Sequence, residues 1–291
     1  MSKPRIADEI ERYLRTGDTD SIYSAWPGNI MEAGRLAQAD LRGALVKEVR
    51  RLAKGRQHDS VPADVSVSFT RTKVEPMVRG LFPRAEQDAV LATLEKAVVY
   101  VTSETIESLL MTHDYDSSAW NLANMFLRSV GAEMLGEDPM SIVGLSESTT
   151  CYVSPSYFAE EDPFADFIVH EAAHVFHNCK RRTLGLRETR TREWLLDVEY
   201  RKRETFAYSC EAYARVMAQA QSPAERRSLA AEYGSKVRIS EERVDPGEVA
   251  SIVAAAASAR NGWKVIPARC APTSRPKSAL QHLREAHAVI D

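Results

Sequence analysis

Along most of the chain, apolar residues recur every three or four positions, which is the spacing of one face of a helix. This pattern predicts helices over residues 4–15, 29–54, 83–111, 117–135, 191–220, 222–235, 246–260 and 278–290. Short alternating or β-branched runs predict strands at 65–70, 141–146, 148–154 and 263–266. We therefore expect a mainly α protein of the α+β class, in which a small mixed sheet accompanies many helices.

One apolar, helix-compatible run contains several polar residues that need partners. Residues 167–177 read FIVHEAAHVFH. A helix turns by about 100° per residue, so His170 and His174 lie one turn apart on the same face, with Glu171 beside them. Asp162 followed by Pro163 predicts the start of this helix. Burying imidazoles and a carboxylate without partners is costly, which favours a metal site over a buried structural helix.

The spacing of His170, Glu171 and His174 is that of zinc hydrolases. Two imidazoles one turn apart can bind one Zn²⁺ at about 2.0–2.1 Å each. The carboxylate between them can take a proton from the water that attacks the substrate. We expect the two histidines to be ligands and Glu171 to be the general base. The alternative is that the histidines only satisfy hydrogen bonds in the core.

A third ligand is expected because catalytic zinc usually has three protein ligands and one open position. Glu204 and Glu211 lie two turns apart on one stripe of the predicted helix 191–220, so both are candidates. Tyr208 lies on the same stripe, one turn after Glu204. Its hydroxyl is a candidate donor to the oxyanion that develops during hydrolysis, and His113 in a predicted loop is another.

The order His170-Glu171-x-x-His174 followed by Glu204-x-x-Ala207 resembles the gluzincin metallopeptidases. In that group the second helix supplies a glutamate ligand, and a small residue three positions later lets the two helices pack closely. The resemblance covers residues 145–220, and the stretch 212–214 is loosely similar to the ImmA/IrrE-type regulatory peptidases. It implies a zincin-like two-helix site in which His170, His174 and Glu204 hold Zn²⁺.

Two further polar residues have alternative roles in such a site. If Glu204 is the ligand, Glu211 either orients a ligand histidine or pairs with Arg215 one turn away. If Glu211 is the ligand, the expected role of Glu204 is a salt bridge. His177 either supports the metal site from behind His174 or fills a gap in the interior.

The resemblance also assigns a role to the strand before the motif. In gluzincins an edge strand preceding the active-site helix pairs with an extended substrate. If this holds here, residues 148–153 bind a peptide by strand addition. An ordinary core strand is an equally good interpretation of the same residues.

Composition narrows the class of protein. Apolar residues make up 44% of the chain and charged residues 27%, which is typical of a folded globular protein. The net charge of −3 gives no general affinity for nucleic acid. No apolar run approaches about 20 residues, so no membrane span is expected. The polar N-terminal segment and four cysteines without paired spacing predict a cytoplasmic protein with reduced thiols.

These observations predict a zinc metallopeptidase that hydrolyses peptide bonds in a protein or peptide. A zinc amidase or other hydrolase, and a non-catalytic regulatory protein on a zincin fold, are the alternatives. We expect residues 1–135 to form a helical region that positions substrate and residues 136–291 to form the zincin-like core with C-terminal helices. One compact domain is the alternative. The sequence determines neither the substrate nor the oligomeric state.

Overall fold

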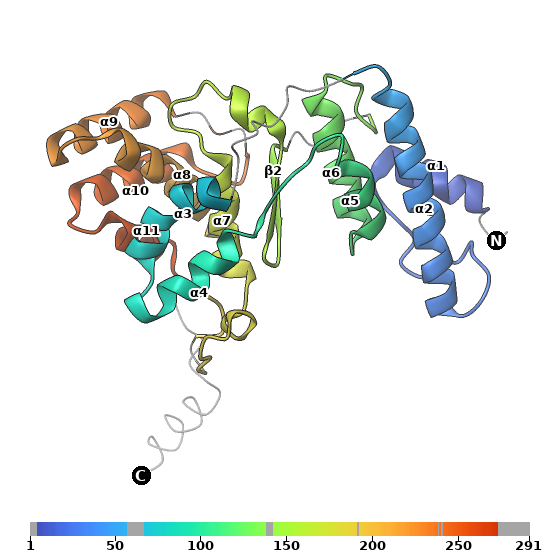
Figure 1. The fold of residues 1–291 in the computed structure, drawn as a ribbon, viewed down its shortest axis with the longest axis horizontal. Coiled ribbons are helices and arrows are strands. Elements are labelled where there is room, and N and C mark those ends of the chain that lie inside the picture. The colour runs from blue at the N-terminus through green and yellow to red at the C-terminus, as the bar shows by residue number, and fades with distance from the viewer. Residues whose placement is uncertain are drawn as a thin grey trace, which may run out of the picture.

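The computed structural model describes residues 5–56, 67–137, 142–190, 192–237, 239 and 241–272. Four helices from the first half of the chain pack side by side at one end of the molecule (Figure 1). They are α1 (Ile6–Thr16), α2 (Ile30–Leu52), α5 (Ile106–Thr112) and α6 (Asp116–Ser129). Their core is mainly apolar but includes the buried Arg42, whose Nε lies 2.7 Å from a carboxylate oxygen of Asp116 and which also donates to the Leu110 carbonyl. This pairing compensates the buried charge.

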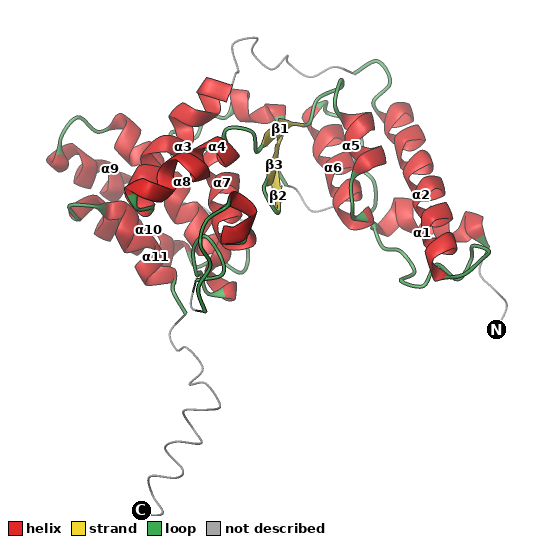
Figure 2. Ribbon diagram, turned by 60° about the horizontal axis from the view of Figure 1, so that its bottom comes forward, coloured by secondary structure: helices red, strands yellow, loops and turns green. Residues whose placement is uncertain are grey.

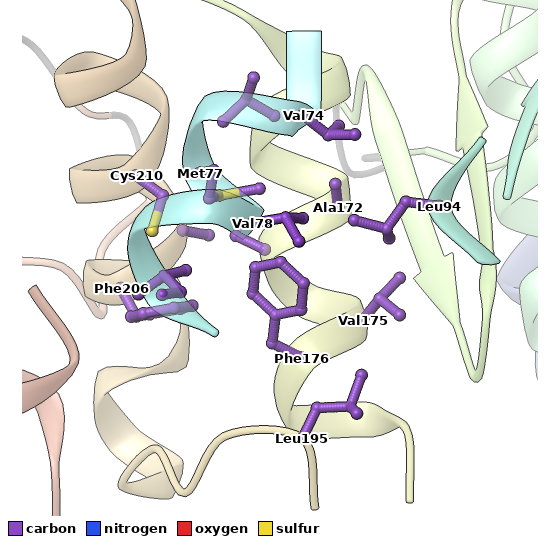
Figure 3. Packing of buried hydrophobic residues seen from close by; sticks show 14 of the residues in the cluster. Val74, Met77, Val78, Leu94, Ala172, Val175, Phe176, Leu195, Phe206 and Cys210 are labelled. Atoms are coloured by element: carbon purple, nitrogen blue, oxygen red, sulfur yellow. The ribbon is translucent and has the colours of Figure 1, made fainter. Parts of the chain in front are cut away.

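The remaining helices form a second group around α7 (Phe167–Asn178) and α8 (Arg203–Gln219). The others are α3 (Val67–Leu81), α4 (Arg84–Leu94), α9 (Pro223–Lys236), α10 (Pro246–Ser258) and α11 (Gly262–Cys270). Figure 3 shows how Val78 of α3, Phe176 of α7 and Phe206 of α8 meet in the core of this group. Hydrophobic packing therefore places α3 and α4, which precede residue 135, in one group with helices that follow it. We expected the chain to divide at residue 135.

A three-stranded sheet lies between the two groups of helices (Figure 2). Its order is β1 (Val98–Tyr100), β3 (Thr150–Val153), β2 (Gly144–Glu147). Strand β1 runs parallel to β3, and β2 runs antiparallel to it. The prediction of a mainly α protein with a small mixed sheet is confirmed. Since β3 is the central strand, the structure agrees with the second interpretation of residues 148–153, an ordinary core strand, and not with an edge strand. The edge strand that contacts α7 is β2.

Two predicted strands are helical in the structure. Residues 67–70 begin α3, and residues 263–266 lie inside α11. In α11 the apolar residues Trp263 and Ile266 are three positions apart and both buried, which suits a helix as well as a strand. The predicted terminal helix 278–290 lies outside the described residues, as do residues 57–64 of the predicted loop.

Two long predicted helices are interrupted. The segment 83–111 contains α4, then β1, then α5, because the β-branched run at 98–102 pairs with β3. The segment 191–220 becomes helical only at Arg203. Before it, Leu195 is buried, and its backbone N–H donates to the Cys179 carbonyl (3.1 Å). Helix α6 ends at Ser129 rather than near 135, and α7 begins after Asp166 rather than at Asp162. The 3₁₀ turns are Pro155–Ala159, Arg181–Leu184 and Tyr200–Lys202.

All four cysteines are free and buried, as the sequence predicted. No helix within the described ranges is both long and apolar enough to span a membrane.

Candidate metal centre

Helices α7 and α8 bring three potential metal ligands together. His170 and His174 lie one turn apart on α7, and Glu204 lies in the first turn of α8. Oε2 of Glu204 is 3.6 Å from Nε2 of His170 and 3.4 Å from Nε2 of His174. One ligand atom from each residue lies within 4.8 Å of the other two, so the three could hold a metal ion. The structure thus brings together the histidines of the motif and the favoured glutamate.

Local sequence explains why the two helices meet at this point. The side chain of Asp166 accepts a hydrogen bond from the backbone N–H of Val169 (3.4 Å) and so caps α7. Ala172 and Ala173 of α7 and Ala207 of α8 are buried in the same hydrophobic cluster. Such small side chains let two helix backbones come close, which brings Glu204 within reach of both histidines.

Glu211 lies on the other side of His170 from Glu204. Its Oε2 is 3.0 Å from Nδ1 of His170, and its Oε1 accepts the backbone N–H of Asp166 (2.7 Å). A carboxylate accepts only, so Nδ1 of His170 donates to Glu211, and Nε2 is the nitrogen that faces Glu204. Glu211 therefore orients His170, one of the three candidate ligands. The alternative pairing with Arg215 is not formed, because Nε of Arg215 donates to the Pro163 carbonyl.

His174 is oriented by a chain of two residues. Its Nδ1 lies 3.0 Å from Nε2 of His177, whose Nδ1 lies 3.1 Å from Oδ1 of Asn178. Since the amide oxygen accepts, His177 donates from Nδ1 and accepts at Nε2, and His174 donates from Nδ1. Nε2 of His174 is then the nitrogen that faces Glu204. His177 is thus a hydrogen-bond partner of His174 and is itself buried in the interior.

The charges around His170 favour a cation at the centre of the cluster. Burial lowers the pKa of His170, but hydrogen bonds with Glu204 and Glu211 outweigh this and raise it to about 10. Burial raises the pKa of Glu204, but its hydrogen bonds with His170 and His174 hold it well below its usual range. Burial, the charge of His174 and that of Arg203 lower the pKa of His177 to about 3, so this imidazole is neutral at neutral pH.

Glu171 is buried beside the three ligands and is held by strand β2. Its Oε2 accepts a hydrogen bond from Oγ of Ser146 (2.5 Å), and the same hydroxyl lies 2.9 Å from the Glu171 carbonyl. A Cβ at Gly144 would overlap the Glu171 carboxylate, so any larger residue at this point of the strand would displace that side chain. Neither Gly144 nor Ser146 was predicted from the sequence as a site residue. A glycine inside a predicted strand was the available signal, since it often marks a close approach.

The cluster opens into a cleft of about 910 Å³. Its walls include the β2 residues Gly144–Ser146, the motif residues and Tyr208, whose ring centre lies 4.6 Å from that of His170. Burial is the main cause that raises the pKa of Tyr208 to about 12, so its hydroxyl remains a donor. His113 does not line this cleft. It is buried near the end of α5, 3.4 Å from Glu147.

Comparisons with protein-family models, with curated proteins and with solved structures give no match.

Proposed function

We propose that the protein is a zinc metallopeptidase that hydrolyses peptide bonds in a protein or peptide substrate. The convergence of His170, His174 and Glu204 in a large cleft, with Glu171 at their side, carries this proposal. Three ligands leave a position for water and substrate, whereas structural zinc sites use four protein ligands. The resemblance to gluzincins in motif and spacing supports the same assignment.

The residues present fit zinc. Two imidazoles and one carboxylate are a common catalytic zinc set. Zinc would bind Nε2 of both histidines, because the protein already binds their Nδ1 atoms, an arrangement typical of zinc ligands. Zinc at this point would polarise a substrate carbonyl and lower the pKa of bound water toward about 7.

The other side chains have distinct roles in this proposal. Glu171 accepts a proton from the attacking water and delivers it to the leaving amine nitrogen. The hydroxyl of Ser146 holds one oxygen of that carboxylate in place. Tyr208 donates to the oxygen of the carbonyl under attack, where negative charge develops.

The edge strand β2 supplies a surface for the substrate backbone. Gly144, Leu145 and Ser146 line the cleft, and β3 occupies only one side of β2. An extended peptide could pair with the other side. In this proposal the substrate pairs with β2, and not with residues 148–153 as the resemblance implied.

The four free cysteines support a cytoplasmic location as part of the same proposal.

The test compares the wild type with Glu171→Gln for bound zinc and for cleavage of a peptide library. We expect equal zinc contents and a loss of hydrolysis by about 10²–10⁴-fold, since only the base is removed. Equal hydrolysis by both proteins would exclude Glu171 as the base. Cleavage of simple amides but of no peptide would favour the amidase. Bound zinc without turnover of either class would favour the regulatory protein.

A further inference from the structure

One end of the cleft is lined by arginines that the proposed reaction does not use. Arg201 lies in the 3₁₀ turn before α8, and Arg203 is the first residue of α8. Arg243 belongs to the segment between α9 and α10, so it comes from a distant part of the chain. All three line the cleft together with Tyr200. The fold thus gathers three cations beside the proposed metal centre.

Two of these arginines have no acidic partner. Among the residues that the structure describes, neither Arg201 nor Arg203 forms an ion pair. Nε of Arg203 is buried and has no hydrogen-bond partner within the described part of the chain. Buried guanidinium donors are normally satisfied, so an unpaired one in a cleft wall points to a ligand group that supplies the acceptor.

Tyr200 and Arg243 shape the same end of the cleft. The guanidinium carbon of Arg203 lies 5.0 Å from the centre of the Tyr200 ring, which restricts its orientation. Tyr200 is itself 74% exposed. Glu241, which also lines the cleft, pairs with Arg243 through Nε (2.6 Å), and the terminal N–H groups of Arg243 form no hydrogen bond within the described residues.

We infer that Arg201, Arg203 and Arg243 form a carboxylate-binding subsite that selects peptide substrates with an acidic group close to the scissile bond. Arginine matches a carboxylate through paired N–H donors, which makes these hydrogen bonds strong and directional. Arg203 adjoins Glu204 in the chain, and an extended peptide advances about 3.3 Å per residue. The acidic group therefore lies within about three residues of the bond that is cut. The selection of substrates for cleavage rests on the proposed peptidase function. The binding of a carboxylate by these arginines does not.

The first experiment measures the cleavage preference of the full-length, zinc-loaded protein on a proteome-derived peptide library. We expect Asp or Glu to be enriched at one position near the cut. At that position, kcat/KM should fall about 10-fold when Glu is replaced by Gln in matched peptides. Arg203→Gln and Arg201→Gln should remove this difference. Arg260→Gln, an exposed arginine outside the cleft, is the matched control and should retain it.

The same matched peptides identify the source of the carboxylate. If it is a side chain, the Glu-to-Gln change lowers kcat/KM whether the peptide ends in an acid or an amide. If it is the C-terminal carboxylate, amidation alone lowers kcat/KM. Either pattern supports the subsite, provided that Arg201→Gln or Arg203→Gln abolishes it. Cleavage without any acidic preference would overturn the subsite and leave the proposed peptidase standing.

A binding measurement separates the two proposals. It uses the Glu171→Gln protein and the fluorescence anisotropy of a short fluorescein-labelled Glu-rich peptide and its Gln counterpart. We expect the Glu peptide to bind about 10-fold more tightly, and a further Arg201→Gln change to cancel the difference. This preference without any hydrolysis by the wild type would refute the peptidase but not the subsite. Equal binding of both peptides would refute the subsite.

Discussion

At the scale of single residues, the hydrogen-bond partners of each side chain separate the candidate metal ligands from the groups that support them. His170 and His174 each have Nδ1 bound by the protein, and Nε2 of each faces Glu204. Glu211, which the sequence left as a competing ligand, binds the opposite nitrogen of His170. The spacing of the two glutamates could not decide between them, because both lie on one helix stripe.

The choice of third ligand predicts an order of zinc affinities. Glu204→Ala removes a ligand and should weaken zinc binding by more than 10-fold, whereas Glu211→Ala leaves the ligand atoms in place and should have a smaller effect. Competition with a chelator measures both. Glu232→Ala, on the exposed side of α9, is the control and should bind zinc as the wild type does. The reverse order for Glu204 and Glu211 would make Glu211 the ligand.

The chain from Asn178 through His177 to His174 predicts a second effect. His177→Phe fills the space but offers no acceptor, so zinc affinity should fall about 10-fold or more. His177→Gln keeps a side-chain oxygen that can accept from His174 and should lose less. A role in packing alone predicts the opposite ranking, because Phe then replaces the imidazole better than Gln does.

At the scale of elements, strand β2 positions the base through Gly144 and Ser146. Gly144→Ala places a methyl group against the Glu171 carboxylate. We expect hydrolysis to fall by about 10-fold or more while zinc is retained, and overpacking to lower the free energy of unfolding by about 1–3 kcal/mol. Peptide hydrolysis, zinc content and denaturant unfolding give the three quantities.

Gly43 is the matched control for this substitution. It lies within α2, and a Cβ there meets nothing within 4 Å. Gly43→Ala should leave hydrolysis unchanged and stabilise the protein by up to about 1 kcal/mol, because alanine favours a helix. Full activity of Gly144→Ala would mean that the contact between β2 and Glu171 does not position the base.

Helix periodicity predicted most elements of this protein but misjudged where several begin and end. In the predicted helix 191–220, residues before Arg203 have helical spacing yet lie against α7 in an irregular segment. The carbonyls of Phe176 and Cys179 at the end of α7 accept the N–H groups of Leu196 and Leu195. These long-range hydrogen bonds replace helical ones. The spacing of apolar residues within the segment does not indicate them.

At the scale of the whole molecule, a bound metal would join segments that are far apart in the sequence. The site depends on β2, α7 and α8, and α3 and α4 pack against the same core. We expect zinc to raise the melting temperature by about 5 °C or more over the chelated protein, since binding to the folded state alone stabilises it. Differential scanning fluorimetry measures this shift. Glu204→Ala should abolish it, and a shift retained in that variant would place the metal elsewhere.

The sequence by itself determined the fold class and the pairing of His170-Glu171-x-x-His174 with a later glutamate, because helical spacing fixes which side chains share a face. Only the tertiary structure decided that Glu204 faces both histidines and Glu211 supports one of them. It also decided that β2 rather than 148–153 is the edge, and that arginines from two segments meet in one cleft. These outcomes depend on how elements pack and pair over long distances, and the periodicity of a single segment carries no information about them.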